Sequence, residues 1–319
     1  MTSPKHAHDT DNGRYYHHPE TGEQLVSVTN ALSTGMAKFG LPLWYARLAT
    51  EAAWDLLPLM AAALRRTPCG LKDDDACGTC QACLTTRIKG AAENTRDSAA
   101  NLGTRVHNLA EAHVLGRILV PEPGDAEAEQ YIEQYLKFLK DFDIQLDRDI
   151  ESAELTVAHP GLGYAGTLDV IAQLKLDGFL PGEKVGVKKS DQRARWLFDI
   201  KTSRTRAATQ TYPENPLQLT ALKNATEMWL PDDTVAPMIR GIKGCAVLNL
   251  RPNTYEFIPL PTGTGEFKAF KALLEQTKWK HEQWPGEYDF RPITPTGRFK
   301  PKRGDSGNTD TSPSTRKAA

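Results

Sequence analysis

The chain has 319 residues, of which 39% are hydrophobic and 25% are charged. These proportions indicate a globular protein with a sizeable core, in one large domain or two small ones. The formal net charge of -1 excludes an overall basic character, although 39 Lys and Arg residues leave room for a local basic surface that binds nucleic acid. No stretch has the roughly 18 apolar residues of a membrane-spanning helix, and the N-terminus lacks the apolar core of a secretory signal. We therefore expect a cytoplasmic protein with no membrane partner and no structural disulfides.

The chain begins with a polar segment, residues 1–22, which is rich in His, Asp and Gly and is expected to be disordered. Residues 25–29 (Leu-Val-Ser-Val-Thr) predict a short extended segment. An apolar helical region follows over approximately residues 41–66, which we expect to be core or a lid over a site. Residues 23–92 are thus interpreted as one helical region, which ends with a group of cysteines.

Four of the five cysteines lie in the spacing C-x7-C-x2-C-x2-C: Cys69, Cys77, Cys80 and Cys83. Thiolates at this spacing can converge on one metal ion, and Gly70 and Gly78 permit the tight turns of such a knuckle. A structural Zn²⁺ fits a closed four-sulfur site best. A 4Fe-4S cluster is the alternative because C-x2-C-x2-C also occurs in cluster-binding runs, and four free thiols in a loop are the alternative without a metal. The fifth cysteine, Cys245, lies in an apolar strand and is expected to be buried.

Two amphipathic helices are predicted after the cysteines, over residues 94–116 and 125–141, because apolar residues recur there at helical spacing. The first helix carries His107. A single helical histidine is usually structural, but His107 and Glu111 are four residues apart, share a face and could reach the same site.

Three strands are predicted next, over residues 152–157, 164–173 and 196–202. Side chains alternate between the two faces of a strand, so each strand presents one acidic residue on the face opposite an apolar row. These acidic residues are Glu154, Asp169 and Asp199.

The third of these strands also carries a lysine. Trp196, Phe198 and Ile200 form its apolar row, and Asp199 and Lys201 lie on the other face. An acid and a lysine two residues apart can hold a divalent cation and a water together, whereas Asp-x-Lys alone is most often a surface ion pair. Three acidic residues on successive strands favour the site.

The rest of the chain completes the predicted core. Residues 175–194, rich in Gly and Lys, are expected to form a long hairpin loop, and a helix that opens at Pro213 carries Gln218 beside its apolar stripe. Two more strands and a helix follow, over residues 244–250, 255–259 and 266–284. Residues 295–319 are expected to form a disordered tail.

The order helix, strand, strand, strand, helix, strand resembles the PD-(D/E)XK nuclease superfamily, and within it the RecB-like exonucleases, including the CRISPR-associated and phage-encoded branch. The matching segments are Gly103-Thr104-x-x-His107, Gly166-Thr167-x-Asp169, Asp199-Ile200-Lys201 and Gln218, and the resemblance covers roughly residues 25–290. It implies an α/β (α+β) fold with a restriction-endonuclease-like core over residues 93–294, in which helices flank a central mixed β-sheet. The N-terminal helical region with its knuckle at residues 69–83 precedes this core.

The resemblance also implies a role for each matched residue. Asp169, Asp199 and the backbone carbonyl of Ile200 would bind Mg²⁺ or Mn²⁺, with His107 as a further ligand. Lys201 would orient or activate the attacking water, and Gln218 would position Lys201 or the DNA backbone. Glu154 fits an additional acidic position. This donor set suits Mg²⁺, which prefers oxygen ligands, and a bound ion acidifies water and neutralises phosphoryl charge.

The function implied is a metal-dependent DNA exonuclease that acts on linear ends or single strands, in recombination and repair or in phage DNA processing. The alternatives are a catalytically silent nucleic-acid-binding or scaffold protein with the same fold, and an endonuclease or RNA-cutting enzyme. Five basic residues could contact phosphates: Arg105, Lys188, Lys189, Arg204 and Arg206.

Two features depart from the family pattern. The helix with Gln218 often reads Gln-x-x-x-Tyr in the family, and here the last position is Leu222. Iron–sulfur members have one early cysteine and three near the C-terminus of the core, whereas all four cysteines of this group precede His107. The cluster therefore cannot be transferred residue by residue, and Zn²⁺ is preferred.

Overall fold

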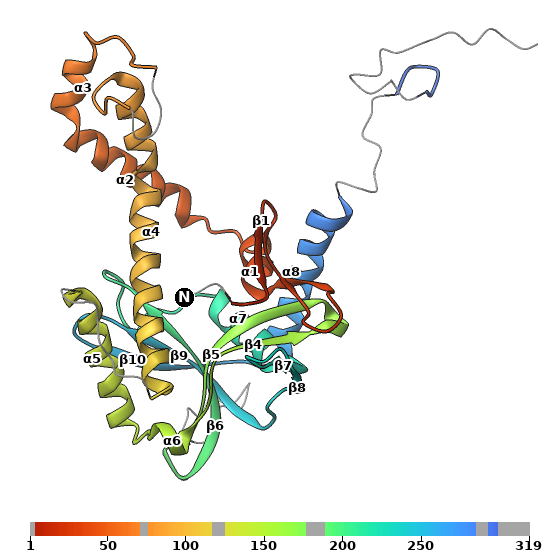
Figure 1. The fold of residues 1–319 in the computed structure, drawn as a ribbon. Coiled ribbons are helices and arrows are strands. Elements are labelled where there is room, and N and C mark those ends of the chain that lie inside the picture. The colour runs from red at the N-terminus through yellow and green to blue at the C-terminus, as the bar shows by residue number, and fades with distance from the viewer. Residues whose placement is uncertain (1–3, 71–75, 117–124, 177–188, 285–292, 299–319) are drawn as a thin grey trace, which may run out of the picture. The chain divides into compact units, whose positions relative to one another are not determined.

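The computed structural model describes residues 4–70, 76–116, 125–176, 189–284 and 293–298 (Figure 1). The chain divides into two units, residues 1–277 and 278–319. Among the described residues, no helix combines the length and the apolar character that crossing a membrane requires.

The strands are β1 (Ala7–Thr10), β2 (Gly13–His17), β3 (Gln24–Ser27), β4 (Ile150–His159), β5 (Tyr164–Leu176), β6 (Lys189–Thr202), β7 (Glu227–Trp229), β8 (Val235–Pro237), β9 (Ile242–Leu250) and β10 (Tyr255–Leu260). The helices are α1 (Val28–Gly35), α2 (Gly40–Asp55), α3 (Leu57–Ala63), α4 (Gln81–Val114), α5 (Ala126–Asp141), α6 (Leu146–Asp149), α7 (Glu214–Lys223) and α8 (Thr264–Lys278). Short helical turns cover Pro160–Leu162 and Trp279–Gln283.

The described strands form one ten-stranded mixed sheet. Its centre is the series β4, β5, β6, β9 and β10, in which only the β6–β9 pair is parallel. A parallel pair needs a crossover connection, and α7 lies in the segment between β6 and β9. The predicted mixed α+β fold, with helices flanking a central mixed sheet, is confirmed at this level.

Helices cover both faces of this sheet with separate apolar clusters. On one face, Trp196, Phe198 and Ile200 pack with residues of α4 and α5, including Tyr135 and Phe138. On the other face, residues of α1, α7 and α8 pack around side chains such as Leu197. The predicted alternation along β6 is therefore confirmed, and it leaves Asp199 and Lys201 on the face away from the aromatic row.

The N-terminal segment does not match its prediction. Residues 1–22 were expected to be disordered because they are polar, but β1 and β2 form a hairpin that continues through β3 to β5. The apolar contribution comes from Tyr15 and Tyr16, which are buried. The two-residue turn is Asp11-Asn12, since Thr10 pairs with Gly13, and Gly13 has a φ of 96°, which favours glycine. Two buried tyrosines and this turn outweigh the polar composition.

The region before α4 also differs from its prediction. The helix expected over residues 41–66 is broken at Leu56, because Pro58 is tolerated only in a first helical turn and here lies in the first turn of α3. Helix α2 has no buried residue and α3 has only Ala63, so this region is not core. It packs on α4, which starts at Gln81 and not at residue 94. The predicted boundary at residues 92 and 93 thus falls inside one helix.

Of the remaining predictions, the start of α5 and the burial of Cys245 are confirmed, and the hairpin loop differs from its predicted bounds. Helix α5 begins at the predicted position because Asp125 caps it by accepting a hydrogen bond from the Ala128 backbone N–H at 3.2 Å. The hairpin loop predicted over residues 175–194 is shorter, since β5 extends to Leu176 and β6 starts at Lys189, and its centre lies outside the described residues. Residues 294–298 form a turn, and the rest of the predicted disordered tail also lies outside the described residues. Cys245 is buried, as predicted.

Candidate metal-binding active site

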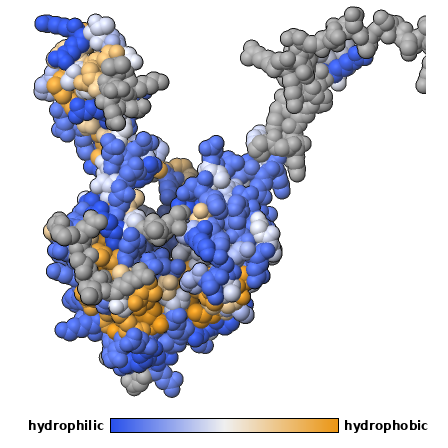
Figure 2. Space-filling view, viewed as in Figure 1, coloured by the Kyte–Doolittle hydropathy of each residue, from blue (hydrophilic) through white to orange (hydrophobic). Residues whose placement is uncertain are grey.

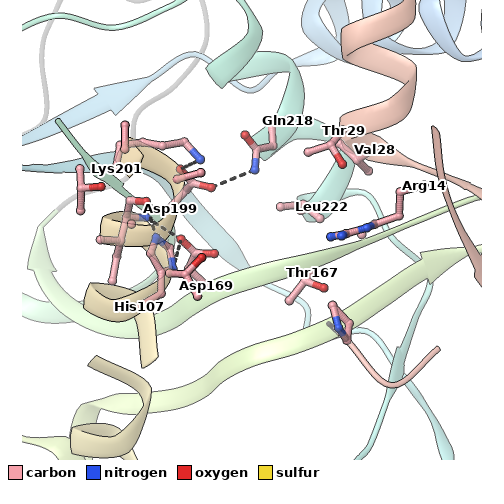
Figure 3. Close-up of a pocket in the computed structure, with 18 of the residues that line it drawn as sticks. Arg14, Val28, Thr29, His107, Thr167, Asp169, Asp199, Lys201, Gln218 and Leu222 are labelled. Atoms are coloured by element: carbon pink, nitrogen blue, oxygen red, sulfur yellow. Dashed lines mark hydrogen bonds and ion pairs between the residues drawn. The ribbon is translucent and has the colours of Figure 1, made fainter. Parts of the chain in front are cut away.

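A pocket of about 470 Å³ lies where α4, β5, β6 and α7 meet the N-terminal hairpin and α1 (Figure 3). Its wall includes His107, Asp169, Asp199, Lys201 and Gln218, which come from four different elements. The sequence motifs therefore converge on one cavity of a size typical of ligand sites.

His107 joins α4 to the two acidic strands. Its Nε2 donates to the Ile200 carbonyl at 2.9 Å, because a carbonyl oxygen can only accept. Its Nδ1 lies 3.3 Å from Glu154 Oε1 and 3.7 Å from Asp169 Oδ2. Burial disfavours the imidazolium, but the charges of Asp169 and Glu154 more than offset burial and raise the pKa of His107 to about 9. The ring thus compensates two carboxylates that would otherwise repel each other.

Asp169 is buried between two other carboxylates, those of Asp199 and Glu154. Its carboxylate is buried and accepts the Ile200 backbone N–H at 2.7 Å, which links β5 to β6. Burial, together with the carboxylates of Asp199 and Glu154, raises the pKa of Asp169 to about 7. The negative charge of this group is therefore under-compensated in the protein alone.

Glu154 reaches the site through an irregular backbone. Its φ is 49°, in the left-handed region that residues other than glycine rarely adopt. Its neighbours stay in the β4–β5 ladder, Ala153 opposite Val170 and Leu155 opposite Leu168. Such strain persists only where the surrounding structure enforces it, and it is concentrated at functional sites. The distortion lies at the residue whose carboxylate contacts His107.

Asp199 and Lys201 form an ion pair on one face of β6, with 2.6 Å between Asp199 Oδ2 and Lys201 Nζ. The other carboxylate oxygen, Oδ1, accepts from Gln218 Nε2 at 2.9 Å. Partial burial disfavours the Lys201 ammonium, which is half-exposed, but the carboxylates of Asp199 and Asp169 outweigh it and raise the pKa of Lys201 above its usual value. Apart from this ammonium, the buried Asp199 Oδ2 meets no donor among the described residues.

The structure separates the predicted metal ligands into two groups. Ligand atoms of His107, Glu154 and Asp169 lie within 4.8 Å of one another, so these residues could share one ion. Asp199 does not belong to that group in the described part of the chain, because Lys201 and Gln218 hold its carboxylate. The carbonyl of Ile200, also predicted as a ligand, accepts from His107. Glu154, which the sequence placed only at an additional acidic position, thus lies with His107 and Asp169 in the group that could bind one ion.

The glycine of the Gly-Thr-x-Asp segment has a packing role. A Cβ added to Gly166 would lie 2.9 Å from Leu222 and 3.0 Å from Val28, too close for any larger residue without rearrangement. Leu222, where the family pattern has tyrosine, is buried against this strand. Gly166 therefore lets α7 and α1 approach β5 beside Asp169.

The sequence reading missed residues that hold the loop after Lys201. Arg251, at the end of β9, is buried and donates to the carbonyls of Lys201, Arg206, Ala207 and Leu250. Asn249 donates to Ala208 and Gln210 at 2.7 and 2.9 Å. The sequence signal for these residues is the segment Asn249-Leu250-Arg251, in which two polar residues stand where the apolar run of β9 ends.

Two of the five basic residues proposed as phosphate contacts form ion pairs outside the pocket. Arg105 pairs with Asp125 and Glu127, and Arg204 also pairs with Glu127. Arg206 is exposed. Lys188 and the side chain of Lys189 lie outside the described residues. Arg14 of β2, which was assigned to a disordered segment, lines the pocket instead.

The four cysteines of the N-terminal group converge at the start of α4, where Cys80 is the N-cap residue. Their sulfurs lie within 4.8 Å of one another, and the closest pair, Cys80 and Cys83, is 3.4 Å apart. The Cys80 backbone N–H donates to Cys77 Sγ at 3.3 Å, and hydrogen bonds from the backbone N–H groups of Cys83 and Cys69 lower the pKa of Cys80 to about 6. This arrangement could hold a structural metal.

Comparisons with known proteins add little. No protein-family model matches the chain, and no curated protein matches it. The crystal structure of SSO0001 is 13% identical over 73% of this chain and 88% of that chain, with a TM-score of 0.26. A likeness at this TM-score carries no argument about fold or function.

Proposed function

We propose that the protein is a metal-dependent nuclease of the PD-(D/E)XK superfamily, in the RecB-like exonuclease branch, with a restriction-endonuclease-like core. The observation that carries the proposal is one pocket lined by His107, Asp169 and the Asp199–Lys201 pair, with the Glu154 carboxylate beside His107 and Asp169. The elements α4, β4, β5, β6, α7 and β9 also occur in the order that the resemblance implies, with α5 and α6 inserted before β4 and β7 and β8 inserted before β9.

The donor set fits Mg²⁺ or Mn²⁺. Carboxylate oxygens and one imidazole nitrogen suit these ions, and the sulfur ligands that softer metals prefer do not occur in the pocket wall. The buried Asp199 Oδ2, with only Lys201 beside it among the described residues, supports a need for further positive charge, as does the direction in which burial and neighbouring carboxylates shift the pKa of Asp169. His107, Glu154 and Asp169 would hold the ion, with Asp199 completing the site. A bound ion would acidify water and neutralise phosphoryl charge.

The other residues of the site would position the attacking water and stabilise the charge that builds on the phosphate. The half-exposed Lys201 ammonium would orient the attacking water and offset charge that builds on the phosphate. Asp199 fixes that ammonium, and Gln218 fixes Asp199 through the Oδ1 bond. The substrate class we favour is DNA with linear ends or single strands, and the setting is recombination, repair or phage DNA processing.

The test is cleavage of end-labelled linear DNA, closed circular DNA and RNA by the purified protein with Mg²⁺ or Mn²⁺. We expect metal-dependent cleavage of linear DNA, and we expect Lys201→Ala to slow it by about 10²–10⁴-fold, the usual size of such a contribution. Lys137→Ala is the matched control, because Lys137 is also ion-paired to an aspartate but lies on α5 outside the pocket.

Each alternative has its own outcome in this assay. Cleavage of circular DNA would indicate an endonuclease, and cleavage of RNA alone would change the substrate class. No metal-dependent cleavage of any substrate by the wild type would leave the catalytically silent nucleic-acid-binding or scaffold protein as the remaining reading.

We infer that the cysteine group binds a single Zn²⁺. A tetrahedron of sulfurs around Zn²⁺ at about 2.3 Å has edges of about 3.8 Å. Four of the sulfur–sulfur distances lie between 3.4 and 3.8 Å, close to that value. In a 4Fe-4S cluster each thiolate binds a different iron, which spreads the sulfurs further apart. Elemental analysis with an absorption spectrum tests this: Zn in a colourless protein supports it, and iron in a brown protein favours the cluster.

A further inference from the structure

The pocket contains a cationic side chain that the proposed reaction does not use. Apart from His107 and Lys201, Arg14 is the titratable cation on the described pocket wall. Figure 3 shows its guanidinium directed into the pocket from the side away from the Asp199–Lys201 pair. This residue comes from β2, in the N-terminal hairpin.

The backbone around Arg14 is fixed to α1. Asn30 is buried, and its Nδ2 donates to the carbonyls of Asn12 at 2.9 Å and of Arg14 at 3.3 Å. Gly13 makes this contact possible, because any Cβ at that position would overlap the Asn30 side chain. The hairpin turn therefore cannot shift without breaking both bonds. A side chain on such an anchored backbone is suited to hold a ligand in one orientation.

Asp9 orients the Arg14 guanidinium but engages only some of its N–H donors. Asp9 accepts from Nε at 2.9 Å and from Nη2 at 3.0 Å. Arginine has five N–H donors in a planar fork, so the Nη1 edge is left for a ligand. The side chains of Arg14 and Asp9 are 36% and 68% exposed, and a pair this exposed is weakly held. Two hydroxyls, of Thr29 and Thr167, line the pocket nearby (Figure 3).

We propose that Arg14, with the hydroxyls of Thr29 and Thr167, forms a second phosphate-binding subsite. It holds a phosphate of the nucleic-acid strand next to the phosphodiester that lies at His107, Glu154 and Asp169. The inference rests on the proposed nuclease function and adds the residue that fixes the strand's register. Arginine suits this role because its fork binds two phosphate oxygens at once. The phosphate has two possible sources, an internal phosphodiester or a phosphate at the end of a strand.

The kinetic test compares the wild type with Arg14→Gln on linear DNA that carries either phosphate or hydroxyl groups at its ends. We expect KM to rise about tenfold with kcat within about twofold, the pattern of a lost binding contact. Arg14→Lys restores the charge but not the fork, so its KM should stay raised. Arg47→Gln is the control, since Arg47 is another exposed arginine, paired with Glu51, outside the pocket.

A binding test separates this inference from the catalytic one. In a Lys201→Met background, which removes the lysine that we assign to the reaction, the affinity for labelled single-stranded DNA is measured against salt. Loss of one phosphate contact should reduce the slope of log K against log salt by about 0.7. Arg14→Lys should keep the wild-type slope because it retains the charge. Circular dichroism checks that each variant is folded.

The outcomes are distinct. A KM effect only on phosphate-ended DNA assigns the subsite to a terminal phosphate, and an equal effect on all ends assigns it to an internal phosphodiester. Unchanged KM and unchanged salt slope in Arg14→Gln, with an active wild type, overturn the subsite and leave the nuclease proposal standing. With an inactive wild type the nuclease proposal fails, and the salt slope alone decides whether Arg14 contacts phosphate.

Discussion

The charges of the pocket are balanced only in part by the protein itself. Asp169, Glu154 and Asp199 supply carboxylates, and His107 and Lys201 supply the cations beside them, whereas Arg14 on the same described pocket wall is paired with Asp9. Because burial and its neighbours raise the pKa of Asp169 to about 7, ionising this carboxyl opposes folding when no ion is bound. A divalent cation would relieve that opposition, so the metal-free protein should be less stable than the loaded one.

Asp169→Asn should therefore stabilise the metal-free protein. The pKa of Asp169 in the folded chain, about 7, exceeds its ordinary value of 3.8, so the stability that this group contributes is lost as pH rises from about 4 to 7. Asparagine does not ionise and can still accept the Ile200 N–H. At pH 8 without metal, the variant should be more stable by about 2 kcal/mol in urea unfolding.

The same variant provides a check on metal binding. Addition of Mn²⁺ should raise the melting temperature of the wild type and leave Asp169→Asn nearly unchanged. An equal rise in both proteins would show that the ion binds elsewhere. Below about pH 3 the difference in stability between the two metal-free proteins should become small, because Asp169 is then mostly protonated in both the folded and the unfolded chain.

The backbone at Glu154 allows a second residue-level prediction. In an ordinary strand alanine is preferred over glycine, but at a φ of 49° a Cβ costs about 1 kcal/mol and glycine avoids this cost. Glu154→Gly should thus be more stable than Glu154→Ala, by about 1 kcal/mol in urea unfolding. Both variants lose the carboxylate and should lose metal-dependent cleavage alike. The usual order, with alanine more stable, would mean that the backbone relaxes when the carboxylate is removed.

At the scale of elements, α4 connects the two candidate metal sites. The helix, labelled in Figure 1, has 34 residues. It begins at the cysteine group and carries His107 towards its C-terminal end. Cys83 and His107 are 24 positions apart, about 36 Å along a helix. Around the cysteine end the helices α2 and α3 expose large apolar side chains, and Figure 2 shows apolar surface there. Few of the described side chains are buried at that end, among them Ala63 and Leu84, so a metal bound by the cysteines would add stability that the small apolar contact lacks.

Removal of the metal should loosen only that end of α4. In Cys80→Ser we expect loss of the bound ion and faster amide hydrogen exchange in α2, α3 and the first turns of α4. The half of α4 that packs on the sheet should keep its protection, since Leu102, Val106 and Ala110 are buried there. Cys245→Ala is the control and should keep the full metal content. Loss of protection across the sheet as well would show that the cysteine site stabilises the whole fold.

Elements with a strong periodicity of apolar residues could be predicted from the sequence, whereas short elements with few apolar residues could not. The alternation along β6 and the capped start of α5 were readable because local pattern and burial agree. The N-terminal hairpin was missed because its strands have only four and five residues, and polar composition hid the Asp11-Asn12 turn before Gly13. In the site, strand alternation indicated the face of the acids, but the left-handed backbone of Glu154 depends on tertiary packing that no local pattern reveals.

At the scale of the whole sheet, the N-terminal segment joins strands that are far apart in the strand order. Trp229 of β7 lies among the rings of His6, Tyr16 and His18, with centroids 5.6, 6.2 and 5.4 Å away. Lys5 and His6 also pair with Asp233, in the turn between β7 and β8. Two kinds of contact, apolar packing and ion pairs, therefore hold the hairpin that carries Arg14.

Apolar packing around Trp229 should contribute more than the ion pairs of Asp233 to holding the N-terminal hairpin against β7 and β8. Trp229 is buried, and its truncation to alanine should cost about 3–5 kcal/mol because it leaves a large cavity. Asp233→Asn removes the ion pairs, but these are partly exposed and should contribute less than about 1 kcal/mol. Asparagine also tolerates the φ of 69° at position 233, so no new strain is introduced. Urea unfolding of the two variants measures the difference, and a larger loss in Asp233→Asn would show that charge closes the sheet. If Arg14 binds phosphate, Trp229→Ala should also raise KM, because the hairpin that positions Arg14 is loosened.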